Sequence, residues 1–215
     1  MNIVFEGITG TGKTTLINQL YEKMKKNNLE VTKISEIDSI SPLSSALGKM
    51  CEKDTFLRMK EPFSTVITES LILSADYQYM KEYTDKIKGY KLFDRDIFTE
   101  IVYQKYFIER EYGKDNDFFD NWKNCLLFKP KKIDLIIYVE APIKICIKRN
   151  EERDNHKLLD DDKRILKDLS VLQKEYVISY CNNENVDLIF LDGTKNIDEN
   201  IELIYSYIKN NKFII

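Results

Sequence analysis

The chain has 215 residues, of which 43% are hydrophobic and 32% charged, and its formal net charge is -3. This composition excludes a disordered chain, and the length suits one domain with a sizeable buried core. The negative charge argues against a nucleic-acid-binding surface, which would need a basic face to neutralise phosphates, so we expect small-molecule partners and no nucleic acid.

Several further kinds of protein are disfavoured by the sequence. The four cysteines are widely spaced and include no C-x-x-C pair, so neither a zinc site nor a disulfide framework is indicated. The sequence does not open with a basic-then-apolar signal segment, and no apolar run approaches the ~20 residues that would span a membrane. We therefore expect a cytoplasmic protein with no membrane partner. Because no linker or repeat is visible, we expect a single domain over residues 1–215.

The stretch 2–16, NIVFEGITGTGKTTL, predicts a phosphate-binding loop. Four or five residues that could form a buried strand lead into Gly7-x-x-x-x-Gly12-Lys13-Thr14, and helical spacing follows at once. The glycines let backbone N–H groups turn inward around a triphosphate, where side chains would block the approach. A glycine-rich turn without a ligand is the alternative, and the complete motif between a strand and a helix argues against it.

The loop pattern also assigns roles to its side chains. Lys13 comes at the start of the helix, where its ammonium and the positive end of the helix dipole would both face the phosphates. The Thr14 hydroxyl is placed to bind Mg²⁺. The loop residues that we expect to contact ATP are Gly7, Thr9, Gly10, Thr11, Gly12, Lys13, Thr14 and Thr15.

Beyond the loop, hydrophobic spacing predicts strands that alternate with helices. Further strands are expected at residues 31–34, 90–93, 133–139 and 188–191. Helices are expected at residues 13–24, 43–50, 63–87, 97–112, 119–128 and 197–208, after Pro142, and around 169–180. This alternation predicts an α/β fold in which a parallel sheet has helices on both faces, as in the P-loop kinase-like three-layer sandwich.

Polar segments follow two of the predicted strands. Glu36 comes after the second strand, and Asp94-Arg95-Asp96 comes after the third. Because α/β sheets bind ligands at the carboxyl ends of their strands, both segments are candidates for a functional site. The acid and base of the second segment could instead form an exposed ion pair that caps the next helix, since Asp is a common N-cap.

Several segments resemble the thymidylate kinase family, in the right order and over nearly the whole chain. FEGITGTGKTTL resembles that family's FEGxDGxGKTTQ, and TESLILSADY, residues 68–77, is similar to TELLLFAADR. FDRDIFTEIVYQ, residues 93–104, resembles DRYxxSxxAYQ, and IDLIIYVEAP, residues 133–142, resembles PDLTIYLDVPPE. The resemblance implies a five-stranded parallel core and Mg²⁺-dependent transfer of the ATP γ-phosphoryl group to a nucleoside monophosphate, with dTMP as the first choice.

The resemblance also implies a lid and a homodimer. Residues 151–167 are the most charged stretch of the chain, and composition alone predicts that such a run is an exposed surface. In the family this region belongs to a closing lid, which we place around residues 149–165. The family likeness further suggests a homodimer that forms through the long helices.

Roles can be carried over residue by residue. Lys13 and Thr14 would hold the donor phosphates and Mg²⁺, and Asp94 would order the metal or its waters. Arg95 would contact the transferred or acceptor phosphate. These roles suit phosphoryl transfer, which needs cations around the migrating charge. With the lid arginines included, the catalytic candidates are Lys13, Asp94, Arg95, Arg149 and Arg153.

The resemblance implies further candidates for binding the donor, ATP. Arg149 and Arg153 match the lid arginines that cover the donor. The turn Asp192-Gly193-Thr194 matches the loop that lies against the adenine. We therefore add Arg149, Asp192 and Thr194 to the expected ATP contacts.

Departures from the family pattern lie mainly on the acceptor side. Where the family has arginines that grip the acceptor phosphate, this chain has Ser35 and Tyr77, and where it has the phenylalanine that stacks on thymine, this chain has Leu73. The family's P-loop aspartate and the tyrosine of DRY are replaced by Thr9 and Asp96. The candidates for acceptor binding are Glu36, Leu73, Tyr77, Arg95, Tyr103 and Gln104.

Two other functions remain open from the sequence. DRDIF also resembles the DRSIF segment of deoxynucleoside kinases, in which case Glu36 would act as general base on a 5′-hydroxyl. The chain could also be an ATP-binding regulatory module without phosphotransfer, although the intact Asp94, Arg95 and lid arginines argue against that.

Overall fold

The computed structural model describes residues 1–35, 40–53, 65–127 and 130–210. In these residues five strands form one sheet, in the order β2-β3-β1-β4-β5. All four neighbouring pairs are parallel, which confirms the predicted five-stranded parallel sheet. The strands are β1 Asn2–Glu6, β2 Val31–Ile34, β3 Tyr90–Asp94, β4 Leu135–Glu140 and β5 Asp187–Asp192.

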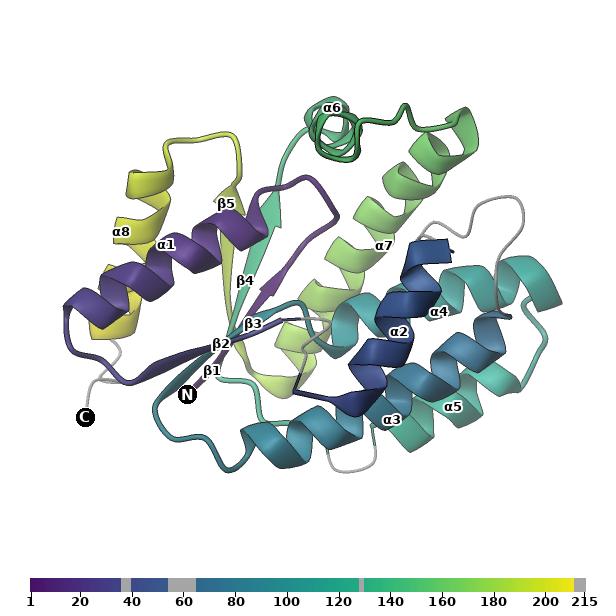
Figure 1. Cartoon of the computed structure of the whole chain (residues 1–215), viewed down its shortest axis with the longest axis horizontal. Helices are drawn as coiled ribbons and strands as arrows, with labels where there is room; N and C mark the ends of the chain where they lie inside the picture. The colour runs from purple at the N-terminus through teal and green to yellow at the C-terminus, as the bar shows by residue number, and fades with distance from the viewer. Residues whose placement is uncertain (36–39, 54–64, 128–129, 211–215) are drawn as a thin grey trace.

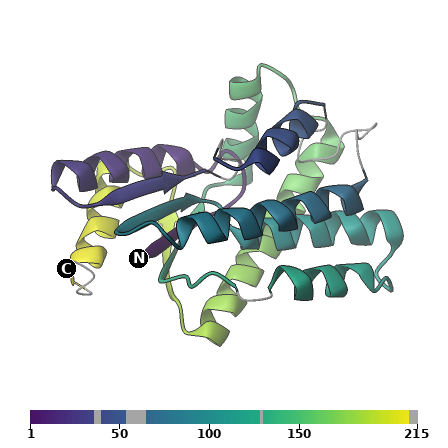
Figure 2. The same ribbon diagram turned by 60° about the horizontal axis from the view of Figure 1, so that its bottom comes forward.

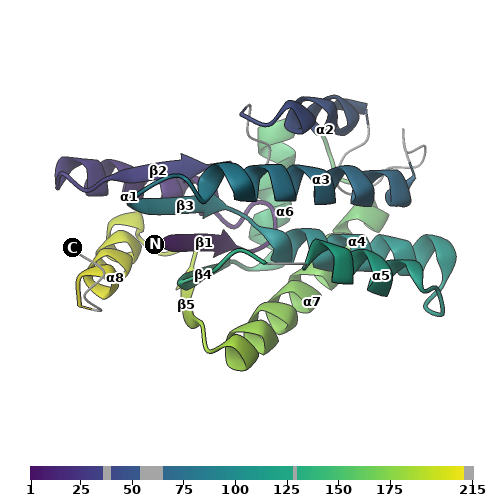
Figure 3. The same cartoon turned by 90° about the horizontal axis from the view of Figure 1, so that it is seen from below.

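Helices cover both faces of this sheet, as predicted (Figure 1). Helices α1 and α8 pack together on one face, and α4 and α7 pack together on the other. Figures 2 and 3 show that α3, α4 and α5 lie side by side on the second face, with α2 placed outside α3. The helices are α1 Lys13–Lys26, α2 Pro42–Lys53, α3 Val66–Thr84, α4 Ile97–Tyr112, α5 Phe118–Leu126, α6 Ile143–Asp154, α7 Asp160–Glu184 and α8 Ile197–Asn210.

The central strand β1 is completely buried and feeds two hydrophobic cores. Ile3 and Phe5 belong to the core shared with α1 and α8. Val4 points to the opposite face and belongs to the core shared with α4 and α7. This alternation follows from the two-residue period of a strand. Since β1 lies between β3 and β4, the loop after it emerges at the middle of the carboxyl edge of the sheet.

Helix α7 begins earlier than the sequence pattern predicted. We expected this helix around residues 169–180, whereas it begins at Asp160 and takes in part of the charged run. Ile165 and Leu166 are buried in the core and anchor the added turns. Three acidic residues occupy the first turn, where the positive end of the helix dipole favours negative charge. Charged residues outnumber apolar ones in this stretch, so the hydrophobic spacing did not reveal the side chains that pack inward.

Helix α6 connects β4 to α7 and lies at the carboxyl edge of the sheet, above the loop that follows β1 (Figure 1). Within the described ranges, each helix is too short or too polar to cross a membrane.

Candidate functional site

The loop between β1 and α1 has the backbone conformation that its glycines predict. Gly7 and Gly10 have φ angles of 133° and 85°, a region that residues with a side chain rarely adopt. A Cβ on Gly7 would lie 2.2 Å from the Val139 carbonyl oxygen, and one on Gly10 would lie 2.5 Å from that of Cys146. These glycines are therefore required by close packing against β4 and α6 as well as by the turn itself.

The ammonium of Lys13 lies inside this loop. Lys13 is 6% exposed, and its Nζ donates to the carbonyl oxygens of Gly7 at 2.7 Å and Ile8 at 3.0 Å. The Thr11 hydroxyl also donates to the Ile8 carbonyl. Helix α1 begins at Lys13 with no acidic residue in its first turn, where Thr15 is exposed. The loop thus combines a held cation with the positive end of a helix, which suits a bound polyphosphate.

Thr14 and Asp94 bring two oxygen ligands together beside the loop. The Thr14 hydroxyl donates a 2.6 Å hydrogen bond to Asp94 Oδ2 at the end of β3. A hydroxyl and one carboxylate fit Mg²⁺, which usually binds one or two carboxylates together with substrate phosphates and waters. Across the described residues, no three His, Cys, Asp or Glu side chains gather as a metal site held by protein ligands alone. The two residues therefore fit a metal that arrives with its nucleotide.

Arg149 joins the phosphate loop to the turn after β5. Its Nη1 donates to the Gly10 carbonyl at 3.0 Å, and its Nη2 donates to the Gly193 carbonyl at 3.1 Å. A Cβ on Gly193 would lie 1.9 Å from the Thr11 carbonyl oxygen, so this turn and the loop are in direct contact. The structure thus brings together three segments that the sequence predicted to bind the donor. They are the phosphate loop, the C-terminal half of α6 and the turn after β5.

The remaining donor candidates lie at the rim of the same group. Arg153 donates to both carboxylate oxygens of Asp154 and, at 3.3 Å, to the Thr9 hydroxyl. Asp192 Oδ1 accepts hydrogen bonds from the backbone and hydroxyl of Thr194, and these bonds lower the pKa of Asp192. Thr194 is thereby held at the surface of the turn.

Arg95 lies in a strained turn between β3 and α4. Its φ angle of 70° is left-handed, a conformation uncommon for any residue other than glycine. Its backbone N–H donates to the Phe5 carbonyl at 3.0 Å, and its guanidinium carbon lies 5.9 Å from the centre of the Tyr103 ring. Asp96 caps α4 through a 2.7 Å hydrogen bond from the Ile97 N–H, but it is buried and not part of the exposed ion pair considered as the alternative.

The acceptor candidates are only partly brought together. Tyr103 is buried beside Arg95, and buried Gln104 accepts a hydrogen bond from the Ser70 hydroxyl. Leu73 is partly exposed on α3. Tyr77 is 6% exposed, and its hydroxyl accepts a hydrogen bond from the backbone N–H of residue 131, so it is enclosed in the core on the far side of α3 from solvent. Glu36 lies outside the described residues.

Residues 5–204 match the sequence model of thymidylate kinase. The chain belongs to the thymidylate kinase family. It is similar to "Probable thymidylate kinase 1" of Saccharolobus solfataricus, at 28% identity over 213 residues that cover 98% of each chain. It is also similar to the thymidylate kinase of Sulfurihydrogenibium sp., at 28% identity over 218 residues that cover 99% of this chain and 98% of that one.

Solved structures agree with the fold of this thymidylate kinase family member. A structure of deoxyadenosine kinase from M. mycoides, with products dCMP and a flexible dCDP bound, has a TM-score of 0.67 at 18% identity and covers 98% of this chain and 100% of its own. The same enzyme with bound dATP has a TM-score of 0.65 at 19% identity. At such identity the likeness shows the fold alone.

Membership of the thymidylate kinase family makes the chain a kinase, that is, a phosphotransferase that binds nucleotides. A kinase of this family uses a nucleoside triphosphate as donor. The phosphate loop, Lys13 and the helix α1 terminus are the groups that suit such a donor.

Two residues of this thymidylate kinase family member were missed by sequence reasoning. Glu6 is fully buried, and its carboxylate accepts hydrogen bonds from the Asp96 N–H, the Thr99 hydroxyl and the Gln173 amide. Burial raises the pKa of Glu6 to about 7, against the lowering effect of the hydrogen bonds from Thr99 and Asp96. A lone acid in an otherwise apolar strand was the available signal. Asn150 was also missed; it is buried, and its Oδ1 accepts from the Thr9 hydroxyl at 2.7 Å.

Proposed function

We propose that the chain transfers the γ-phosphoryl group of ATP to a nucleoside monophosphate, with dTMP as the first choice. The observation that carries this proposal is the hydrogen bond between Thr14 and Asp94. This hydrogen bond joins the phosphate loop to the end of β3, and the residue that follows Asp94 is Arg95. The groups that would bind the donor phosphates therefore lie next to the cation that would bind the acceptor phosphate.

The reaction needs positioning and charge stabilisation more than covalent chemistry by the protein. An oxygen of the acceptor phosphate attacks the γ-phosphorus of ATP in line with the bond to the bridging oxygen. That bond breaks, its electron pair stays with the bridging oxygen, and ADP leaves. Lys13 and Arg95 stabilise the charge that spreads over the transferred group, and the backbone N–H groups at the start of α1 hold the donor.

Thr14 and Asp94 are the residues that would hold Mg²⁺. When bound, the metal neutralises charge on the donor phosphates. The hydrogen bond between the two side chains holds their oxygens close together on one side of the loop, which supports this assignment.

We place a lid at residues 149–165 within a single kinase domain. The proposal is supported by Arg149, which already contacts the phosphate loop, and by Arg153, whose guanidinium lies against Thr9. The segment joins α6 to α7 through residues 155–159, and the side chains on both sides of this connection are mostly exposed. A motion of this segment would bring the two arginines over the donor and exclude water.

The choice of acceptor is the least typical part of the site. In the family the positions of Ser35 and Tyr77 carry arginines, and Tyr77 is held in the core. A charge-assisted hydrogen bond contributes about 1.5 to 3 kcal/mol, so the loss of both arginines would weaken monophosphate binding by about a hundredfold or more. We therefore expect dTMP to be a poor acceptor, and a deoxynucleoside is the second candidate.

The test is to measure ADP release from ATP with dTMP, thymidine, and the other nucleosides and monophosphates. Turnover of a monophosphate, abolished in Lys13→Ala but retained in Lys26→Ala on an exposed part of α1, supports the proposal. Turnover only of a nucleoside, lost in Glu36→Gln, would replace it with nucleoside kinase activity. Cooperative binding of ATP without turnover of any acceptor would indicate the regulatory module instead.

We also propose that the chain forms a homodimer through α3. Helix α3 exposes three large apolar side chains, with exposed fractions of 57% for Leu71, 41% for Tyr79 and 37% for Tyr83. Exposed apolar side chains along one helix favour contact with another protein surface. Sedimentation should show a dimer that Leu71→Glu weakens. Leu203→Glu should leave the dimer intact, because this leucine is 50% exposed on α8, on another part of the molecule.

A further inference from the structure

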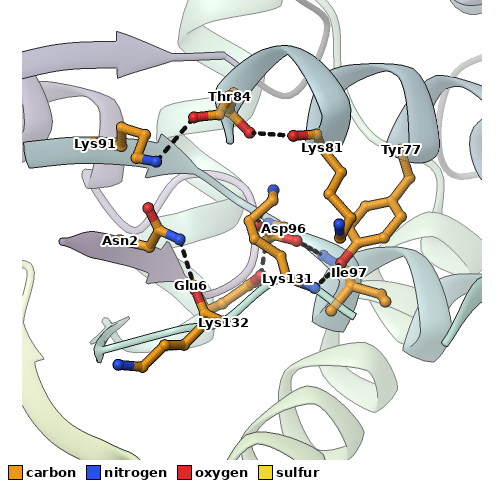
Figure 4. A network of polar contacts seen from close by, with 10 residues as sticks. All are labelled: Asn2, Glu6, Tyr77, Lys81, Thr84, Lys91, Asp96, Ile97, Lys131 and Lys132. Atoms are coloured by element: carbon orange, nitrogen blue, oxygen red, sulfur yellow. Dashed lines mark hydrogen bonds and ion pairs between the residues drawn. The ribbon is translucent and has the colours of Figure 1, made fainter. Parts of the chain in front are cut away.

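A buried ion pair lies beneath the turn that carries Arg95. Lys131 Nζ is 2.8 Å from Asp96 Oδ2, and the exposed fractions of the two side chains are 4% and 1%. Figure 4 shows that Lys131 reaches Asp96 from the segment before β4. Desolvating two charges is unfavourable, and a pair of apolar side chains is often at least as stabilising. The position of this ion pair therefore calls for a reason other than core stability.

Lys131 is held at its backbone and at its ammonium. Its backbone N–H donates to the Tyr77 hydroxyl at 3.1 Å. Its Nζ lies 4.0 Å from the centre of the Phe93 ring and 5.1 Å from that of Tyr77, so both rings can attract the cation. Tyr77 thus holds Lys131 in place, at the position where the family carries an arginine.

Asp96 is in turn held by three separate parts of the fold. Its N–H donates to Glu6 Oε1 at 2.9 Å, and its Oδ1 accepts from the Ile97 N–H at 2.7 Å. The ion pair with Lys131 occupies Oδ2. These contacts come from the end of β1, the start of α4 and the segment before β4, so they fix both the backbone and the side chain of Asp96 (Figure 4).

This anchor is adjacent to a strained residue. Arg95 has a φ angle of 70°, and a left-handed conformation at a residue with a side chain persists only where its surroundings enforce it. On one side the Arg95 N–H is tied to Phe5, and on the other side Asp96 is tied to Lys131. The direction in which the Arg95 side chain leaves the backbone is therefore set by these two ties.

We propose that Lys131 is a positioning residue for phosphoryl transfer: through its ion pair with Asp96 it maintains the left-handed turn that aims the Arg95 guanidinium at the phosphate. The proposal rests on the proposed function of Arg95. Lys131 itself is buried, and no contact with the substrate is assigned to it. It acts only through Asp96, so its effect on catalysis must depend on the presence of Arg95.

The variant for the test is Asp96→Asn/Lys131→Met. It removes both charges together, because Lys131→Met alone would leave an unpaired buried carboxylate and could fail to fold. The amide oxygen of the new side chain can still cap α4. The matched control is Lys132→Met, since the neighbouring lysine is 86% exposed and its ion pair is with Asp134 instead of Asp96.

Hydrogen exchange tests the structural half of the proposal without any substrate. We expect the backbone amides of Arg95 and Asp96 to exchange about tenfold faster or more in the double variant than in the wild type. The amides of β4 should be unaffected, and Lys132→Met should match the wild type throughout. Unchanged exchange at Arg95 and Asp96 would overturn the proposal.

Kinetics with ATP and dTMP test the catalytic half. We expect the double variant to lose about tenfold to a hundredfold in kcat/KM for dTMP, with the KM for ATP unchanged. The same two substitutions added to Arg95→Ala should cost nothing further, because the guanidinium they position is already absent. An equal loss in both backgrounds would show a merely structural role and overturn the proposal.

Failure of the proposed function has a different signature. If the wild type does not use dTMP, or if Arg95→Ala keeps full activity, the proposed role of Arg95 is wrong, and the catalytic part of this proposal falls with it. Hydrogen exchange would still decide whether the ion pair maintains the turn. If Arg95→Ala is slow and the double variant is as fast as the wild type, the role of Lys131 alone is wrong.

Discussion

The Thr14 hydroxyl donates a 2.6 Å hydrogen bond to the carboxylate of Asp94, which lies 80 residues later in the chain. Thr14→Val keeps the shape of the side chain but removes the hydroxyl. Because a hydrogen bond to a charged group contributes about 1.5 to 3 kcal/mol, we expect kcat to fall by about tenfold to a hundredfold. ADP release at saturating ATP and Mg²⁺ measures this effect. Gln19→Ala, at an exposed position further along α1 with no predicted role in the site, should turn over normally, and equal rates in the two variants would contradict the assignment of Thr14.

Arg149 is expected to act in the closed complex. Its guanidinium bridges Gly10 and Gly193, so Arg149→Ala removes this link between the phosphate loop and the turn after β5 and also removes a cation from the donor site. We predict that kcat falls by about tenfold or more while ATP binding weakens less. Arg149→Lys should rescue little, because one ammonium cannot reproduce the planar fork that reaches both carbonyls. Lys148→Ala, which alters a residue that is 75% exposed on the same helix, is the control, and a normal rate in Arg149→Ala would refute the lid.

Glu6 makes folding stability depend on pH. Burial raises its pKa from the usual 4.5 to about 7. Between these values the folded state binds a proton that the unfolded state has lost, so the free energy of unfolding falls as pH rises from about 4.5 to 7. The difference corresponds to at most about 3 kcal/mol for a fully buried group. Below this interval the carboxyl is neutral in both states and the penalty is absent.

Urea unfolding of the wild type and Glu6→Gln at pH 5 and pH 8 measures this effect. We expect the variant to gain stability relative to the wild type on going from pH 5 to pH 8, since its neutral amide cannot ionise. The Gln173 Oε1 atom has no hydrogen-bond partner among the described residues, and the new amide can donate to it after rotation. Glu22→Gln, at an exposed position on α1, should follow the wild type. A constant difference between wild type and Glu6→Gln across the interval would contradict the prediction.

Tyr77 is predicted to be intolerant of a charged replacement. Because the family's arginine at this position grips the acceptor phosphate, an arginine here would be expected to improve monophosphate binding if the side chain pointed into the cleft. The structure instead places the Tyr77 ring in the core, with its centre 5.1 Å from Lys131 Nζ. Tyr77→Arg would bury a second cation beside the first, so we expect it to lower Tm by several degrees or more, consistent with a loss of several kcal/mol.

Tyr77→Phe is the matched comparison. It keeps the ring and removes only the hydroxyl that accepts from the Lys131 N–H, so it should cost about 1 to 3 kcal/mol. Thermal unfolding of both variants gives the answer. A Tyr77→Arg protein as stable as the wild type, with improved kcat/KM for dTMP, would show that this side chain can reach the acceptor after all.

The sequence determined those features of this protein that depend on neighbouring residues alone. The spacing of Gly7, Gly12, Lys13 and Thr14 specifies a loop whose function depends on neighbouring residues, so its structure could be predicted without the rest of the chain. The five strands were recognisable for the same reason, since an apolar run such as β4 must be buried wherever it occurs. The charged stretch at the start of α7 was harder, because its buried Ile165 and Leu166 are outnumbered by charges.

Only the tertiary structure decided how buried polar groups are paired. Lys131 is 35 residues from Asp96, and Gln173 is 167 residues from Glu6, yet each pair meets in the core behind the Arg95 turn. No local sequence pattern predicts such a partner. A lysine before a strand is usually exposed. A tyrosine where relatives have arginine could face the ligand or the core. The sequence determined which groups could carry the chemistry. The packing of β1, α3, α4 and the segment before β4 decided which of them are held in place, because a buried charge is stable only where the fold supplies its opposite.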